Sequence, residues 1–264
     1  MNQSELVKHK FTKDLNEKEL NYRNIIQPQE NEFNDISKWI KGINDGRRNI
    51  SPILYRLIEF KGEILELGAG SCWFSSELSL LKSVNKIYCL DISEFILKNV
   101  APYVMEHLGA NTEKLIRVIG DFNKLYFQDK KFDYVVFDAS LHHIPEDSFI
   151  EILKEVHRVL KIDGKVVAIR ESFLSPIPIF NKYRRRTFGL HEKKYGVTEN
   201  IFTKREWENM FENAGFKCHF IPYDLQVNNT LNLKNLMKKF IKYSPLRAPF
   251  SHFFPRYIIV LKKC

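Results

Sequence analysis

The sequence predicts an α/β fold in which a mostly parallel sheet carries helices on both faces. From residue 63 onward, short apolar runs of strand length alternate with segments that have the periodicity of amphipathic helices. A glycine-containing turn at residues 66–73 joins the first such run to the first helix. The chain is also 44% hydrophobic, which is enough for a sizeable core and excludes wholesale disorder. Alternation of this kind is typical of parallel strands connected by helices.

Each predicted strand is a short apolar run, and each predicted helix has apolar residues three and four positions apart. The predicted strands are 64–67, 86–91, 115–119, 132–138, 165–170, 216–221 and 257–261. The predicted helices cover about 73–82, 93–108, 147–160 and 203–214. Asp163-Gly164 is expected to end the third helix, and Thr203 with Glu206 forms a capping box for the fourth.

The chain divides into an N-terminal arm with cap helices, residues 1–60, and a core domain, residues 61–264, with a basic insertion at 222–255. Residues 1–31 are polar, so we expect them to be partly disordered or loosely docked. The spacing of apolar residues over 32–60 predicts two short amphipathic helices. Long connections in compact domains are usually functional, which makes residues 171–203 a candidate for a binding segment.

The charge distribution and the cysteine usage indicate the cellular compartment of the protein and the kind of partner that it binds. The net charge is +9, but it is local: residues 222–264 hold eight Lys or Arg and one acid, and residues 181–195 hold six and one. Such patches indicate a partner surface. None of the four cysteines is in a CxxC pair, which indicates reduced cysteines. No apolar run has the ~20 residues of a membrane span, and the N-terminus is polar, without a visible secretory signal. We therefore expect a cytoplasmic protein.

The most informative segment is the glycine turn, residues 66–70, which follows a predicted strand and opens a helix. Asp91 ends the next strand, 21 residues after Gly70. This spacing is typical of the carboxylate that binds a ribose hydroxyl in nucleotide-binding α/β folds. However, Trp73 stands where a dinucleotide site has its third glycine, and no P-loop lysine follows. Glu66 would repel a pyrophosphate, so it favours a cationic ligand.

Four features in order, residues 66–70, Asp91, Gly120-Asp121-Phe122 and residues 132–138, resemble the class I S-adenosylmethionine-dependent methyltransferases over roughly residues 60–170. The resemblance implies a Rossmann-like, seven-stranded sheet that ends in an antiparallel hairpin, and S-adenosylmethionine as cofactor. The cofactor-binding residues that it implies are Glu66, Gly68, Ala69, Gly70, Asp91, Ile92, Asp121, Phe122, Asp138 and Ala139.

The same resemblance implies a role for each part of this set. The glycine turn would pass under the methionine part, Asp91 would bind both ribose hydroxyls, and Ile92 would pack on adenine. Asp121 would accept from the adenine amino group, and Asp138 would approach the methionine amino group. Cys72 stands where the family commonly has glycine, and is either a small buried filler or a reactive thiol.

His142 and His143, after the fourth strand, are the candidate general bases, because imidazole titrates near neutral pH. A structural or substrate-lining role is a strong alternative for the pair. No third His, Cys or carboxylate stands beside them at ligand spacing, so no metal is expected. The Asn/Asp-Pro-Pro-aromatic motif of enzymes that methylate exocyclic base nitrogens is absent here, which argues against that class.

Several residues of the basic segments are candidates for binding the acceptor. Three guanidinium groups in a row can clamp phosphate, although such a run is as often a solvated surface. Residues 187–200 resemble loops that close over the acceptor in bacterial small-molecule methyltransferases. Residues 231–243 predict a basic amphipathic helix that lies on an anionic membrane surface or packs on its own domain. The substrate-binding candidates are Arg184, Arg185, Arg186, His191, Tyr195 and Glu199.

These observations favour O-methylation of a small anionic or phosphorylated acceptor, such as a sugar nucleotide or an intermediate of a surface polysaccharide. An RNA-modifying methyltransferase and a non-catalytic protein that keeps the fold are the alternatives. No separate RNA-binding module is visible, so we expect no stable nucleic-acid partner.

Overall fold

The computed structural model describes residues 4–9, 50–194, 196–223 and 256–264. Besides the site candidate Tyr195, three predicted segments fall outside these ranges. They are most of the N-terminal arm, the first of the two cap helices, and the basic helix at 231–243 with nearly all of the insertion around it.

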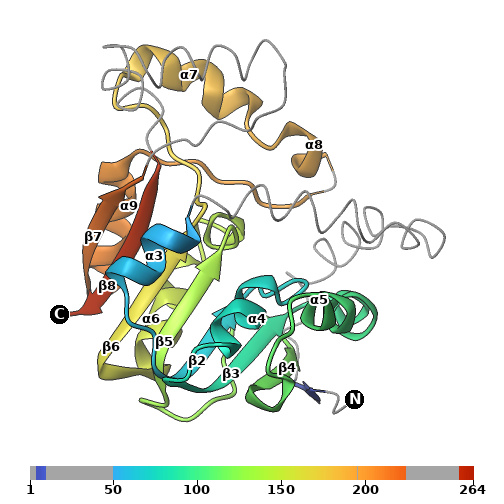
Figure 1. Ribbon diagram of the computed structural model, residues 1–264. Helices are drawn as coiled ribbons and strands as arrows, with labels where there is room; N and C mark the ends of the chain where they lie inside the picture. Colours follow the sequence, from blue (N-terminus) through green and yellow to red (C-terminus); the bar gives the residue numbers. More distant parts are fainter. Residues whose placement is uncertain (1–3, 10–49, 195, 224–255) are drawn as a thin grey trace.

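A single sheet forms the centre of the described structure (Figure 1). Its order is β1-β4-β3-β2-β5-β6-β8-β7, in which β1 to β6 pair in parallel and β8 pairs antiparallel with both β6 and β7. The strands are Glu5–Lys8 (β1), Gly62–Leu67 (β2), Val84–Asp91 (β3), Leu115–Ile119 (β4), Phe132–Asp138 (β5), Leu160–Ile169 (β6), Phe216–Pro222 (β7) and Tyr257–Lys263 (β8). The predicted fold class and its antiparallel terminal hairpin are confirmed.

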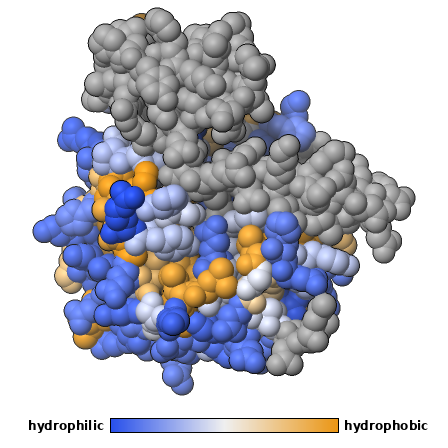
Figure 2. All heavy atoms as spheres, viewed as in Figure 1, coloured by the Kyte–Doolittle hydropathy of each residue, from blue (hydrophilic) through white to orange (hydrophobic). Residues whose placement is uncertain are grey.

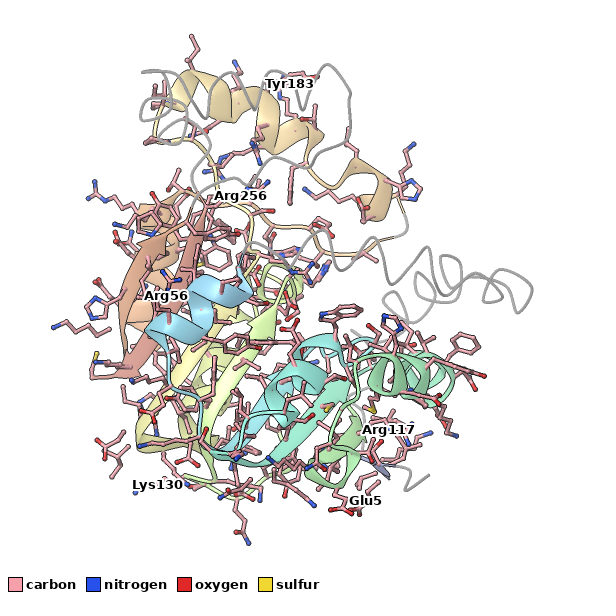
Figure 3. All side chains as sticks on the ribbon, viewed as in Figure 1. Glu5, Arg56, Arg117, Lys130, Tyr183 and Arg256 are labelled. Carbon is pink, nitrogen blue, oxygen red and sulfur yellow. The ribbon has the colours of Figure 1, made fainter. Side chains whose placement is uncertain are left out.

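The sheet has one strand more than the seven expected, because the beginning of the arm pairs with the edge strand β4. Arg117 on β4 holds it there. Its buried guanidinium donates to the carbonyl oxygens of Leu97 at 2.6 Å and Ser4 at 2.7 Å. Arg117 is labelled in Figure 3. A four-residue strand without apolar alternation gives little signal in the sequence.

Helices cover both faces of the sheet, as the alternating pattern predicted (Figure 1). On one face, Leu54 and Phe74 pack with Ile64 in a buried core; on the other, Phe149 and Trp207 pack in a second core. The covering helices are Ser51–Leu57 (α3), Trp73–Ser79 (α4) and Ala101–His107 (α5) on the first face, and Phe149–Val159 (α6) and Lys204–Asn213 (α9) on the second. The capping box at Thr203 and Glu206 is present at the start of α9.

The end of the third predicted helix and the long connection 171–203 differ from the sequence prediction. The helix α6 ends at Val159, and Asp163-Gly164 lies inside β6, so its assignment as a helix end was wrong. Leu160 is already extended and pairs with Phe132, which means that helix and strand follow each other without a turn. The long connection 171–203 contains two helices, Pro178–Thr187 (α7) and Leu190–Lys193 (α8), which lie apart from the covering layers (Figure 1).

Hydrophilic residues cover most of the coloured surface in Figure 2, and hydrophobic ones form scattered patches. Among the described helices, none has the length and apolar character that a membrane span requires.

Candidate cofactor and acceptor site

A cavity of about 460 Å³ opens at the carboxyl ends of the parallel strands. Its volume is within the range of small-molecule sites. All ten residues that the sequence assigned to the cofactor line it, and His143 lines it with them. Sequence reasoning missed further wall residues, among them Ser71, Asn123, Ile144, Pro145, Arg170 and Val197.

The glycine turn needs its two glycines for different reasons. Gly68 has φ +74°, and a Cβ there would lie 2.5 Å from the Cβ of Ser140, whose hydroxyl donates to the Leu67 carbonyl at 2.6 Å. Gly70 has φ +48° and would meet nothing within 4 Å. Because Gly68 has no side chain, the glycine turn can contact the segment that carries Ser140. Gly70 leaves its backbone accessible from the cavity.

Asp91 lies at the end of β3 with its carboxylate against the glycine turn. One oxygen accepts from the Gly70 N–H at 2.7 Å, and the other accepts from the Ser93 N–H at 2.8 Å. Each carboxylate oxygen has a second lone pair, so Asp91 can also receive a pair of hydroxyl groups. The carboxylate is buried and held in one orientation, as the ribose-binding prediction requires.

Glu66 is buried below the turn and faces the start of α4. The backbone N–H of Ser75 donates to it at 2.9 Å, and the Ser75 hydroxyl also donates to it. Together with Asp91, Asp121 and Asp138 it lines a cavity wall that is rich in carboxylates. Such a wall suits a positively charged ligand such as a sulfonium better than a pyrophosphate.

Asp121 and Phe122 follow β4, and their backbone is shaped by a local turn in which Asp121 accepts from the Asn123 N–H at 2.8 Å. Phe122 packs edge-on against Phe137 of β5, with ring centroids 6.3 Å apart. Ile92 enters the same cavity from the end of β3. A carboxylate, an aromatic ring and an aliphatic side chain therefore meet where the sequence expected adenine.

Arg170 is a site residue that the sequence analysis placed only at a strand end. It forms an ion pair with Asp138, and both line the cavity. Arg170 has φ +59° and the neighbouring Ala139 has φ +55°, a left-handed conformation that costs non-glycine residues energy and is often retained at functional sites. The carboxylate of Asp138 is thus already paired with the Arg170 guanidinium. If Asp138 also binds the methionine amino group, as predicted, it must contact both groups.

His142 is buried between two carboxylates, a pair of contacts that local sequence could not reveal. Its Nδ1 lies 2.6 Å from Glu171, which lies two residues beyond the end of β6, and its Nε2 lies 3.7 Å from Glu199. Burial by itself would lower the pKa of His142, but Glu171 and Glu199 raise it on balance. Burial by itself would raise the pKa of Glu171. The positive charge of His142 and the hydrogen bond with it lower this pKa on balance.

Glu171 also fixes the segment that carries both histidines. Its carboxylate accepts from the backbone N–H groups of Ser140 at 3.2 Å, Leu141 at 3.1 Å and His142 at 3.2 Å. The segment is a single 3-10 turn, Leu141–His143. Its position therefore depends on a fully buried acid in the segment that follows β6.

His143 is the histidine that reaches the cavity. Its Nδ1 lies 3.0 Å from the Thr198 carbonyl oxygen and 3.4 Å from Glu199. Glu199 was predicted to bind substrate directly, but it does not line the cavity and instead contacts both histidines. The absence of a third potential ligand, expected from local spacing, does not hold in the folded chain.

The other acceptor-binding candidates do not line the cavity. Arg185 is bonded to Glu206 at 2.6 and 2.9 Å, so its charge is already compensated. Arg186 and His191 are exposed, and Tyr195 lies outside the described residues. Arg184 is half-buried, and both burial and the charge of Arg256 lower its pKa. In Figure 3, Arg256 lies between α7 and the hairpin.

Cys72 is completely buried and has a left-handed backbone, with φ 58°. Burial, with a contribution from Cys89, raises the pKa of its thiol well above 9.0. A reactive thiolate is therefore disfavoured, and the alternative of a small buried filler fits the structure.

Comparisons with known proteins agree with this geometry. Residues 65–168 match a family described as "Methyltransferase domain". Demethylmenaquinone methyltransferase of Staphylococcus aureus is 33% identical over 141 residues, which cover 48% of this chain and 56% of that protein. The chain thus spans about half the length of the curated relatives it matches.

Two solved structures have the same fold at low sequence identity. A chain from the complex of the Haloferax volcanii Trm112 methyltransferase activator with a methyltransferase superposes with a TM-score of 0.61 at 17% identity, covering 86% of this chain and 94% of that one. A SAM-dependent methyltransferase of Methanosarcina mazei has a TM-score of 0.55 at 21% identity, covering 81% and 99%. With its carboxylate-rich cavity at the strand ends, the matched core, residues 65–168, belongs to the class I S-adenosylmethionine-dependent methyltransferase family.

Proposed function

We propose that the protein transfers the methyl group of S-adenosylmethionine to a hydroxyl oxygen of a small anionic acceptor. The observation that carries the proposal is the cavity, where ten residues chosen from sequence motifs meet and His143 stands beside them. The bound cofactor would supply the electrophilic methyl group. The residues of the chain would hold it, orient the acceptor and exclude water.

An acceptor hydroxyl must lose its proton as its oxygen attacks the methyl group. His143 is the titratable side chain that sequence reasoning selected for this task, and it lies on the cavity wall. Its Nδ1 faces the Thr198 carbonyl, which can only accept a hydrogen bond. The neutral ring then has its lone pair on Nε2, the nitrogen of a general base.

Arg184 and Arg256 support an anionic acceptor. Burial and the charge of Arg256 lower the pKa of Arg184, and among the described residues no carboxylate is paired with Arg184. Two guanidinium groups that repel each other gain stability when an anion such as phosphate lies between them. Sugar nucleotides and phosphorylated glycan intermediates have both this charge and free hydroxyl groups.

A second candidate is methylation of a ring carbon of a hydroquinone. The similarity to demethylmenaquinone methyltransferases favours it. Ionisation of a ring hydroxyl activates the neighbouring carbon, so the same His143 could serve this reaction.

The first experiment is calorimetric titration of S-adenosylhomocysteine into the folded protein, which should bind to one site per chain. Labelled S-adenosylmethionine is then offered with two sets of acceptors, nucleoside-diphosphate sugars and reduced 1,4-naphthoquinones. We expect transfer to the first set, weakened in Arg184→Ala and unchanged in Arg186→Ala, whose side chain is exposed. Transfer to the naphthoquinols alone would select the second candidate, and a folded protein that fails to bind S-adenosylhomocysteine would refute both.

A further inference from the structure

We infer that His142, His143 and Glu199 form a binding site for one first-row divalent metal ion of the Zn²⁺ type, at the edge of the cavity. Each residue offers one ligand atom, and these atoms lie within 4.8 Å of one another. The three come from two segments that are distant in the chain, the turn after β5 and the loop before α9.

The distances between the side chains fit shared ligands better than they fit hydrogen bonds. Glu199 lies 3.7 Å from Nε2 of His142 and 3.4 Å from Nδ1 of His143. Good hydrogen bonds between nitrogen and oxygen are shorter, at roughly 2.7–3.2 Å. Two ligands that each lie ~2.1 Å from a tetrahedral ion are separated by roughly 3.4 Å. The carboxylate thus stands at ligand distance from both rings.

Glu171 gives His142 the partner that metal-binding histidines usually have. Its carboxylate lies 2.6 Å from Nδ1 of His142, so Nδ1 donates its proton there and Nε2 is the nitrogen for an ion. Glu171 is itself fully buried and held by three backbone N–H groups. This second carboxylate fixes the ring in the orientation in which Nε2 faces Glu199.

The second imidazole and its surroundings complete the ligand set. Nδ1 of His143 lies 3.0 Å from the Thr198 carbonyl oxygen, and binding an ion at Nδ1 would displace the proton of this hydrogen bond. His143 and Thr198 both line the cavity, so open coordination positions would face the acceptor. Two imidazole nitrogens with one carboxylate suit Zn²⁺ and its first-row neighbours, whereas Mg²⁺ and Ca²⁺ prefer oxygen ligands throughout.

The consequence for the reaction rests on the proposed function. A hydroxyl oxygen bound to the ion has a lower pKa, so the ion would activate the acceptor. His143 would then hold the ion and would not accept the proton. Metal binding itself can be measured without an acceptor, and the two proposals can therefore fail separately.

The test is a titration of ZnCl₂ into EDTA-treated, dialysed full-length protein, followed by calorimetry and by thermal unfolding. A Cys264→Ser background removes an exposed thiol that could bind zinc by itself. We expect one Zn²⁺ per chain and a higher Tm, and no such effect of MgCl₂. Glu199→Gln and His143→Gln should each weaken zinc binding about tenfold or more. Glu192→Gln, in the helix α8 just before this loop and outside the cluster, should bind zinc like the parent protein.

Two results would overturn the inference: no zinc-dependent rise in Tm, or equal zinc affinity in the parent protein and in both cluster variants. The Tm of each variant in EDTA shows that it is folded, and the second variant covers the case in which the first is not. S-adenosylhomocysteine is titrated into the same metal-free protein. Binding there without zinc uptake would reject the ion and leave the methyltransferase proposal, with His143 as base, intact.

Discussion

The two halves of the site are assembled in different ways. In the cofactor half, neighbouring parallel strands end at one edge, and the motifs that follow them meet there; the bond from Gly70 to Asp91 joins residues 21 positions apart. In the acceptor half, the 3-10 turn that carries both histidines is held by residues that are distant along the sequence. Glu171 binds His142 across 29 positions, and Thr198 meets His143 across 55.

This difference explains why one half could be read from the sequence and the other could not. A strand followed by a glycine turn or an acid is a local pattern whose place in a parallel sheet is fixed by the topology. The acceptor half depends on how residues 171–203 fold back over the strand ends, and no local pattern specifies that path. The following substitutions test the contrast, from the largest expected effect to the smallest.

Replacing Glu171 by alanine should have the largest effect on stability. The change removes the acceptor of three backbone N–H groups and leaves His142 buried beside Glu199 without its main partner. Breaking a buried ion pair costs about 3–5 kcal/mol. Chemical denaturation should show this loss of unfolding free energy. A loss below about 1 kcal/mol would mean that the turn does not depend on Glu171.

Gly68→Ala tests the close approach in the cofactor half. The new Cβ would meet Ser140 at 2.5 Å in a left-handed backbone, so strain and overpacking should together cost about 2–4 kcal/mol. Gly70→Ala is the matched control, since its Cβ meets no atom within 4 Å and only the backbone strain of about 1–2 kcal/mol remains. Equal losses of unfolding free energy in the two variants would contradict this interpretation of the turn.

Asp91→Ala should act on binding more than on folding. Loss of hydrogen bonds to a charged group should weaken S-adenosylhomocysteine binding by about 1.5–3 kcal/mol, measured by calorimetry. Asp129→Ala, which removes an exposed acid that does not line the cavity, serves as a control that should bind normally. Unchanged affinity in Asp91→Ala would remove the ribose assignment.

Glu206 should give the smallest effect, and one that depends on pH. Burial would raise its pKa, but its bonds with Thr203 and Arg185 lower the pKa below the ordinary 4.5. A carboxyl group with a lowered pKa in the folded state stabilises the fold above its unfolded pKa and loses that contribution as pH falls through its folded pKa. Glu206→Gln should therefore cost about 0.5–2 kcal/mol near neutral pH, as expected for a helix cap, and progressively less below pH 4.5. A difference that stays constant from pH 7 to pH 3 would rule out this role of the charge.

The fold and the convergence of the ten predicted residues on one cavity followed from the sequence, and the errors have local physical reasons. The edge strand β1 was missed because four residues of mixed polarity form a strand only when Arg117 and β4 are there to pair with them. Asp163-Gly164 has the composition of a helix end, but the parallel pairing of β6 with β5 draws the chain into the sheet from Leu160.

The sequence by itself determined the alternating fold and the ten predicted residues that line the cavity, because each of these is encoded within one strand and the turn after it. Only the tertiary structure decided that Arg170 pairs with Asp138 and that Glu171 and Glu199 enclose His142. The reason is that such contacts join segments whose separation along the chain says nothing about their separation in space. A buried charged side chain is stable only beside a group of opposite charge. Which group that is depends on how the loops fold over the sheet.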